Sequence, residues 1–179
     1  AELEGEELIV DGFTGDVISS PTRTLRRSYI QRQREEKILN KDLQKLRDIP
    51  CITPDGFRFS LWVNTGLRQD TMMSLKSGAE AVGLFRTEIP FLLRSSFPTE
   101  DEQVAIYREQ LVAFSPRPVT MRTLDIGGDK DLPYFPIEEE NPFLGWRGVR
   151  ISLDHPEIFL VQIRALLRAS QGTNNLRIM

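Results

Sequence analysis

The sequence has little of what disulfide-linked and membrane-spanning proteins need. Among its 179 residues are one cysteine and one histidine. A single cysteine excludes an internal disulfide framework and fits a reducing compartment. No run approaches the roughly 18–20 apolar residues that would span a bilayer, and the acidic start AELEGEEL lacks the pattern of a signal peptide. We therefore expect a cytoplasmic protein with no membrane partner.

An excess of charge of one sign is also missing. The chain has 23 Lys and Arg residues against 26 Asp and Glu, a net charge of −3, so no global field draws it to nucleic acid. Residues 22–47 are locally basic, but their few apolar positions make one narrow stripe on a charged rod. That pattern is typical of a solvated helix between two domains, and we expect no nucleic-acid partner.

The first segments of the chain predict a β-hairpin. Residues 7–11 and 16–20 are short apolar runs joined through Gly12 and Gly15. A lone hairpin is marginal in water. We therefore expect these residues to belong to a domain whose main body lies elsewhere.

A long helix is predicted over residues 22–47, which contain no Gly or Pro and are rich in good helix formers. Pro50 and Pro54 then mark a boundary. Cys51 lies between them, beside Pro50 and Ile52, without the positive charge that would activate a thiol. We interpret this cysteine as structural.

From Phe57 onward the sequence alternates between predicted strands and helices. The strands are expected at 58–65, 81–86, 119–124 and from 176, and the helices at 69–77, from the Thr99–Glu102 capping box to Phe114, and from an Asp154–Glu157 cap to about 170. A long loop, expected to be functional, follows Lys130. Repeated strand–helix units imply an α/β fold with a parallel sheet, either doubly wound or closed as an eight-stranded barrel.

Two predicted strands end in an arginine followed by threonine. Alternation places Arg86 on the face of Val82 and Leu84, and Arg122 on the face of Thr120. If the strands are parallel neighbours about 5 Å apart, the two guanidinium groups converge at the carboxyl edge of the sheet, where they suit a phosphate or a carboxylate. The alternative is a pair of solvated or ion-paired surface arginines.

The shared face of these side chains favours the barrel, because the last inward residues of barrel strands line the catalytic mouth. Asn64, Arg86 and Arg122 would be those residues.

Four stretches of the chain resemble enzyme I of the bacterial phosphotransferase system. They are GAEAVGLFRTE at 78–88, PTEDEQVAIY at 98–107, RTLDIGGDKDLPYF at 122–135, and the segment 139–170 that begins EENPFLGWRGVR. The motifs RTE, DIGGDK and ENPFLGWR in this order are specific together. The likeness is greatest to the nitrogen-related branch of that family.

The resemblance implies a partial (β/α)8 barrel of the TIM type, about its first half, preceded by a long linker helix and a remnant β-hairpin. Residues 1–20 would be the C-terminal remnant of a swivelling phosphohistidine domain, residues 21–50 the linker, and residues 57–179 the N-terminal half of the phosphoenolpyruvate-binding barrel. The final LRIM reads as the start of a strand, so we expect a piece of a longer protein.

The resemblance also implies a reaction. In this family the phosphoryl group of phosphoenolpyruvate passes to a protein histidine in the presence of Mg²⁺, which leaves pyruvate. The partners would be a phosphocarrier protein similar to HPr and a second copy in a homodimer, and the role would lie in sugar transport or nitrogen regulation. Arg86 and Arg122 match the family's phosphoryl-binding arginines, and Asn64 and Arg147 are possible further substrate contacts.

No catalytic residue and no metal ligand is assigned within the chain. The family's Gly-Thr-Ser-His type motif is absent, and its Mg²⁺ ligands and catalytic cysteine are expected beyond these residues. His155 is predicted to be structural, and Trp146 to be core or a subunit contact. Asp125, Asp129 and Lys130 lie near the site without an assigned role.

Two rival interpretations stay open. One is a relative of pyruvate phosphate dikinase or phosphoenolpyruvate synthase, which share the barrel chemistry. The other is a non-catalytic half-barrel with a regulatory or dimerisation role. Under the main interpretation the chain carries part of the substrate site and is inactive alone.

Overall fold

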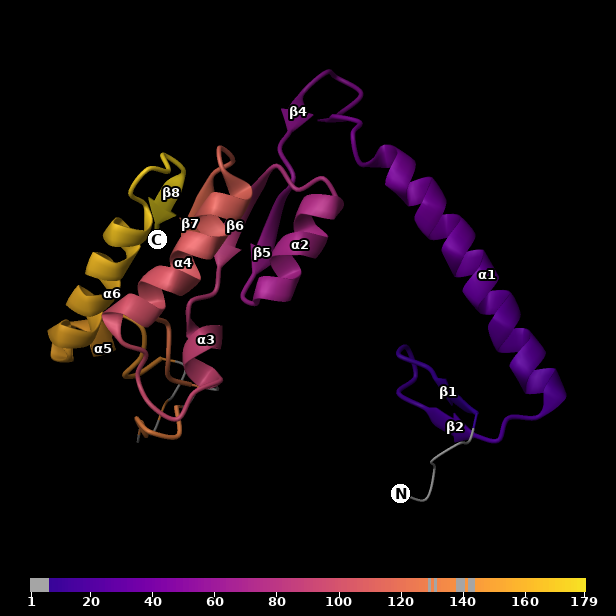
Figure 1. The fold of residues 1–179 in the computed structure, drawn as a ribbon, viewed down its shortest axis with the longest axis horizontal. Helices are drawn as coiled ribbons and strands as arrows, with labels where there is room; N and C mark the ends of the chain where they lie inside the picture. Colours follow the sequence, from indigo (N-terminus) through magenta and orange to yellow (C-terminus); the bar gives the residue numbers. More distant parts are fainter. Residues whose placement is uncertain (1–6, 129, 131, 138–140, 142–143) are drawn as a thin grey trace. The chain divides into compact units, whose positions relative to one another are not determined.

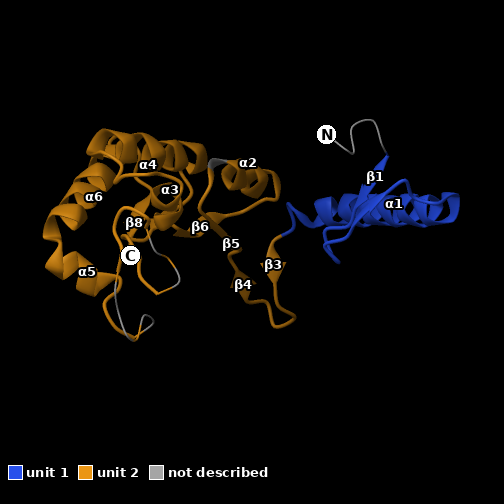
Figure 2. Ribbon diagram, turned by 90° about the horizontal axis from the view of Figure 1, so that it is seen from below, with its two compact units in different colours: residues 1–49 blue, residues 50–179 orange. Residues whose placement is uncertain are grey.

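A computed structural model describes residues 7–179 of the chain except 129, 131, 138–140 and 142–143. The chain divides into two compact units, Ala1–Ile49 and Pro50–Met179 (Figure 2). The predicted assignment of residues 1–20 and 21–50 to separate domains stays a prediction. No helix in the described part of the chain is long and apolar enough to cross a membrane.

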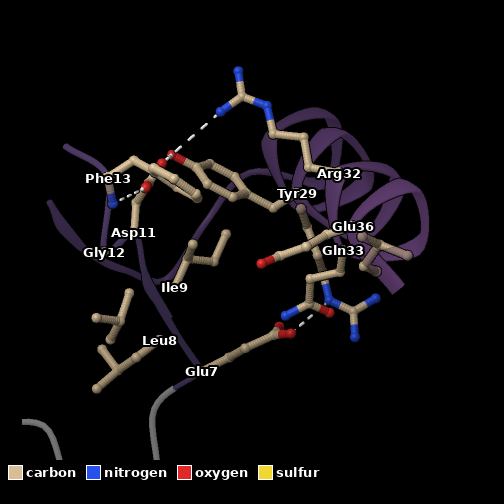
Figure 3. A pocket seen from close by; sticks show the side chains of 13 residues that line it. Glu7, Leu8, Ile9, Asp11, Gly12, Phe13, Tyr29, Arg32, Gln33 and Glu36 are labelled. Atoms are coloured by element: carbon tan, nitrogen blue, oxygen red, sulfur yellow. Dashed lines mark hydrogen bonds and ion pairs between the residues drawn. The ribbon is translucent and has the colours of Figure 1, made fainter. Parts of the chain in front are cut away.

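The first unit contains the predicted hairpin and helix. Strands β1 (Leu8–Val10) and β2 (Val17–Ser19) pair antiparallel, and helix α1 spans Arg23–Leu46. Thr22 caps this helix by accepting a hydrogen bond from the Leu25 amide at 3.3 Å. In Figure 3, Tyr29 and Arg32 of α1 point toward Asp11 of the hairpin, and the Tyr29 hydroxyl donates to Asp11 Oδ2 at 2.9 Å. Both predicted elements are confirmed.

The second unit is built on a parallel sheet of four strands. They are β5 (Trp62–Thr65), β6 (Ala81–Phe85), β7 (Val119–Met121) and β8 (Leu176–Ile178), and they lie side by side in sequence order. Helices α2 (Arg68–Lys76), α4 (Glu100–Phe114) and α6 (Pro156–Ala169) connect them. In Figure 1 these helices run alongside the sheet.

The strand order and the position of the helices decide between the two sheet architectures. A single core joins Phe85 and Met121 of the sheet to Leu111 of α4 and Leu166 of α6, and Leu75 of α2 packs against it. All three connecting helices therefore cover one face. A doubly wound sheet reverses its strand order and carries helices on both faces, whereas sequential order with helices on one face is the pattern of a (β/α)8 barrel. The prediction of a partial barrel is confirmed.

Side chains of the two outer strands meet on one face of the sheet. The guanidinium carbon of Arg177, on β8, lies 5.2 Å from the ring centroid of Trp62, on β5. These strands are three positions apart, a backbone spacing of about 14 Å in a flat sheet, so two long side chains and the inward curl of a barrel-type sheet together account for the contact. Because Val63 and Leu176 next to them pack into the helix-covered core, Trp62 and Arg177 lie on the opposite, concave face.

A β-bulge changes the predicted face of one residue in β6. Val63 pairs with Val82 but Asn64 pairs with Leu84, so Gly83 is an extra residue in its strand. A Cβ on Gly83 would lie 3.3 Å from the Trp62 Cβ. The prediction that Val82 shares a face with Arg86 is therefore wrong, since Val82 packs into the helix-covered core.

The predicted strand at 58–65 is broken in two. Strands β3 (Cys51–Ile52) and β4 (Arg58–Phe59) form a short antiparallel hairpin, and β5 begins at Trp62. The Glu80 carboxylate accepts hydrogen bonds from the Leu61 amide at 3.1 Å and from Arg58 Nη2 at 2.9 Å. The Glu80 carboxylate thus satisfies the Leu61 amide, which in a continuous strand would have bonded to the neighbouring strand.

Two short helices were not predicted, namely α3 (Glu88–Leu92) and α5 (Val149–Asp154). The predicted cap at the start of α6 is wrong. Asp154 does not cap α6. It ends α5, and its carboxylate accepts a hydrogen bond from the Trp146 indole. His155 takes the cap position of α6, and its side chain does not cap the helix. The His155 ring packs against the rings of Phe135 and Trp146.

Candidate functional site

The sheet register brings the two predicted arginines to the same edge. Phe85 of β6 pairs with Met121 of β7, and Arg86 and Arg122 are the next residues. The Arg122 amide donates to the Phe85 carbonyl at 3.3 Å, so the ladder continues past the strand ends. Because Phe85 and Met121 point into the helix-covered core, alternation places both arginines on the concave side. The predicted juxtaposition at the carboxyl edge is present.

Asn64 lies on the same face, one row below the arginines. Its Cα partner is Leu84, two residues before Arg86. Asn64 is exposed, whereas Val63 and Thr65 on either side are partly or fully buried, as the alternation of a strand requires. A substrate contact by Asn64 stays a prediction.

Arg122 is held by three groups. Its Nη2 donates to Glu88 Oε1 at 2.8 Å, its Nη1 lies 3.2 Å from Asp125 Oδ2, and its carbonyl oxygen accepts the Thr87 hydroxyl at 2.7 Å. The side chain keeps 24% of its surface exposed. Among the described residues nothing bonds to its buried Nε. Arg122 is thus oriented at the edge and still reachable.

Glu88 is a carboxylate buried among cations. Its side chain is 0% exposed, and its Oε1 accepts hydrogen bonds at 2.8 Å from both Arg122 Nη2 and Lys130 Nζ. Burial by itself raises the pKa of this carboxyl, but the bonds from Lys130, the residue's own amide and Arg122 outweigh it and lower the pKa below its ordinary value. Glu88 is therefore charged at neutral pH.

Asp125 gathers three cations. Its carboxylate lies 3.2 Å from Arg122 Nη1, 3.2 Å from Arg147 Nη2 and 3.6 Å from Lys130 Nζ. Arg147, predicted as a possible substrate contact, therefore reaches the same cluster from the long loop.

The cluster carries more positive than negative charge. Within the described part of the chain, Arg122, Lys130 and Arg147 face the two carboxylates Glu88 and Asp125. Arg86, one residue past β6, is exposed and makes no side-chain bond with any residue that the structure describes. An anion that bound here would meet the unengaged fork of Arg86 and a net positive field.

Glycine allows the two loops of the site to touch. Gly127 has a φ of +103°, and a Cβ on it would lie 2.8 Å from the Arg147 Cβ. The Gly127 amide donates to the Lys130 carbonyl at 3.2 Å, which closes the turn that delivers the lysine. Gly127, the first glycine of the DIGGDK motif, thus serves close backbone approach. Asp129, in the same motif, lies outside the described residues.

Sequence reasoning missed the parts of the site that do not alternate along a strand. Thr87, Glu88 and Lys130 all contact Arg122 or its partners, yet none received a role. The signal available was the RTE motif, because its last two residues, Thr87 and Glu88, directly follow Arg86 in the sequence. Cys51 is exposed on β3, away from the sheet edge in sequence and in strand pairing.

Known proteins match nearly the whole chain. The family described as PEP-utilising enzyme, PEP-binding domain, matches residues 40–179. A protein of Escherichia coli (strain K12) described as "Phosphoenolpyruvate-dependent phosphotransferase system" is 48% identical over 177 residues, which is 99% of this chain and 24% of that protein.

Two further relatives are described as "Phosphoenolpyruvate-protein phosphotransferase". That of Staphylococcus carnosus (strain TM300) is 48% identical over 93% of this chain and 29% of its own length. That of Latilactobacillus sakei is 44% identical over 98% of this chain and 30% of its own length. The chain thus spans less than a third of the length of these relatives. The resemblance read from the RTE, DIGGDK and ENPFLGWR motifs is confirmed: the chain belongs to the PEP-utilising enzymes, and its second unit lies within their PEP-binding domain.

Proposed function

We propose that this chain supplies part of the phosphoenolpyruvate site of a phosphoenolpyruvate–protein phosphotransferase. In that reaction the phosphoryl group passes to a protein histidine and pyruvate is left. The observation that carries the proposal is the pair of arginines in register at one edge of the sheet, with Arg86 unengaged by any described side chain and Arg122 held by Glu88. The shared family and the names of the relatives support it.

The residue types suit this chemistry. Phosphoryl transfer depends mainly on positioning and on neutralising the charge of the equatorial oxygens. Arginine stays protonated at any working pH and can donate two parallel hydrogen bonds to one oxyanion. Arg86 would contribute an unengaged fork, and Arg122 the donors that Glu88 and Asp125 do not use. Lys130 adds a point charge beside them.

The resemblance implies Mg²⁺, but the carboxylates of this edge do not form a site for it. Glu88 and Asp125 are each engaged by two or more cations, which compete with a metal for the same oxygens. No group of three or more His, Cys, Asp or Glu side chains placed to hold a metal occurs among the described residues. These residues therefore do not fit the ion, which stays a proposal for the complete gene product.

The finer expectations are proposals of the same kind. A phosphocarrier similar to HPr as phosphoryl acceptor, a homodimer, a cytoplasmic location and a role in nitrogen regulation or sugar transport all rest on the resemblance. The dikinase and synthase alternative has less support, because the relatives named above are described as phosphotransferases.

Ligand-dependent thermal stabilisation tests the proposal on the chain itself. We expect phosphoenolpyruvate to raise the melting temperature of the wild type and to lose this effect in Arg86→Ala and Arg122→Ala. Arg164→Ala is the matched control, since Arg164 pairs with Glu100 on the helix side of the unit. A wild type that does not respond, or arginine variants that respond as the control does, would support a half-barrel without a ligand instead. We also expect the chain alone not to release pyruvate.

A further inference from the structure

Three consecutive residues after β6 act at the end of the neighbouring strand. Arg86 presents a fork that no described side chain engages, Thr87 bonds to the backbone of Arg122, and Glu88 bonds to its guanidinium. We propose that Thr87 and Glu88 are positioning residues, which fix Arg122 and Lys130 in the geometry that receives the phosphoryl group. This inference rests on the proposed function. It assigns ligand binding to the first residue of the RTE motif and positioning to the other two.

Thr87 fixes the backbone of the arginine. Its side chain is buried, with the residue 0% exposed, and its hydroxyl donates to the Arg122 carbonyl at 2.7 Å. Strand β7 ends one residue earlier, at Met121. The hydroxyl therefore supports the first residue that has left the regular strand, where rotation about the backbone would otherwise redirect the guanidinium.

Glu88 fixes two cations at once. A single oxygen, Oε1, accepts from Arg122 Nη2 and from Lys130 Nζ, each at 2.8 Å. The two nitrogens therefore lie less than twice that distance apart. Like charges this close repel each other, and the Glu88 carboxylate, at the shorter distances, holds them together with Asp125. Two cations held side by side can bracket one phosphoryl group.

The arrangement leaves donors for a ligand. A guanidinium has five N–H donors and an ammonium three, and Glu88 takes one from each. Asp125 takes further contacts, but it keeps 19% of its side-chain surface exposed. Glu88 is fully buried, whereas Arg122 and Lys130 keep 24% and 26% of their side-chain surfaces exposed, so part of each cation stays open to a ligand.

The bonding of Glu88 is poor for a group that only adds stability. Its second oxygen, Oε2, is buried without a partner among the described residues, and so is Arg122 Nε. Buried ion pairs seldom stabilise a fold more than apolar residues of the same volume, and a partly satisfied one is worse. Burying the Glu88 carboxylate costs stability, yet it orders two cations at the edge of the site. A positioning role explains why this residue is a glutamate.

The test uses the complete gene product that contains this sequence, assayed for phosphoenolpyruvate-dependent phosphoryl transfer. Glu88→Gln keeps the shape of the side chain and removes its charge. We expect it to lower kcat/KM for phosphoenolpyruvate by about 10-fold or more, the range of a lost hydrogen bond to a charged group. The control is Glu102→Gln, in which an ion-paired glutamate bonded to Arg94 and Thr99, and to none of the cations of the site, loses the same charge. We expect that control to keep kcat/KM near the wild-type value.

A second pair of variants covers the case in which Glu88→Gln fails to fold. Thr87→Val removes the hydroxyl at nearly constant volume, and Thr87→Ser restores it. We expect weaker phosphoenolpyruvate binding in the valine variant and recovery in the serine variant.

A double-mutant cycle separates positioning from general destabilisation. If Glu88 acts through Lys130, then Glu88→Gln has a much smaller effect in a Lys130→Met background than in the wild type. The inference is overturned if Glu88→Gln matches the Glu102→Gln control, if the Glu88 and Lys130 effects simply add, or if valine and serine at position 87 behave alike. If Arg122→Ala itself leaves phosphoenolpyruvate binding intact, the proposed function fails first, and that outcome is visible separately.

Discussion

Replacing Gly127 by alanine tests how closely the two loops of the site must approach. A Cβ at this position would lie 2.8 Å from the Arg147 Cβ and 3.1 Å from the Trp146 carbonyl oxygen. Neither atom is the end of a flexible side chain, so the clash is relieved only if the loops move apart. The φ of +103° adds a second cost, because residues with a Cβ rarely adopt it.

The two costs can be measured separately. Gly172 also has a positive φ, +77°, but a Cβ added there would meet no described atom within 4 Å. Gly172→Ala therefore carries backbone strain alone, about 1–2 kcal/mol. Gly127→Ala carries similar strain plus overpacking of about 1–3 kcal/mol. At roughly 2–4 °C per kcal/mol for a chain of this size, we expect Gly127→Ala to melt several degrees below Gly172→Ala.

The ligand response distinguishes the site from the scaffold. Moving the loops apart separates Arg147 from Asp125, so we expect Gly127→Ala also to weaken the stabilisation by phosphoenolpyruvate, while Gly172→Ala retains it. Differential scanning fluorimetry with and without the ligand measures both quantities. Equal melting temperatures for the two variants would refute the close approach of the loops, and equal ligand responses would refute the part assigned to Arg147.

Three other interactions can be tested one at a time. Arg86→Lys should lower phosphoenolpyruvate affinity by about 10-fold or more, because an ammonium cannot replace a bidentate fork; titration calorimetry checks this against Arg164→Lys. Hydrogen bonds from the Thr99 amide, Arg94 and the Thr99 hydroxyl lower the pKa of Glu102 from its ordinary value of 4.5 to about 2. Below pH 4.5 this carboxylate therefore binds protons more readily in the unfolded chain than in the folded one. The stabilisation by Glu102 should be complete above that pH and decline toward pH values of about 2, and Glu102→Gln should remove this part of the pH dependence in urea unfolding. Thr99→Ala should cost about 1 kcal/mol of stability through loss of the α4 cap, whereas Thr99→Ser should not; urea unfolding of the two variants measures the difference.

Elements with strong local signals were predictable from the sequence. The capping box at Thr99 and Glu102 marks the start of α4, which spans Glu100–Phe114, because a cap is a contact between residues three apart. Helix α1 was equally clear from its lack of Gly and Pro. The bulge at Gly83 was not predictable, because alternation assumes one residue per row and an extra residue leaves no mark in the apolar pattern.

The site was half predictable for a related reason. Arg86 and Arg122 could be paired because strand neighbours and a shared edge follow from the repeated strand–helix pattern. Their partners Glu88 and Lys130 could not, because both lie beyond the strands, where no period of two relates sequence position to direction. The choice of a barrel over a doubly wound sheet also depended on long-range packing, namely on which face the helices cover.

The contact between Arg177 and Trp62 gives the curl of the sheet an optical reporter. The chain has two tryptophans, so Trp146→Phe would leave Trp62 as the sole indole emitter. A guanidinium 5.2 Å from the ring perturbs its fluorescence, and that perturbation ends if the outer strands splay apart. Emission from Trp62 would therefore report whether the outer strands β5 and β8 stay close to each other.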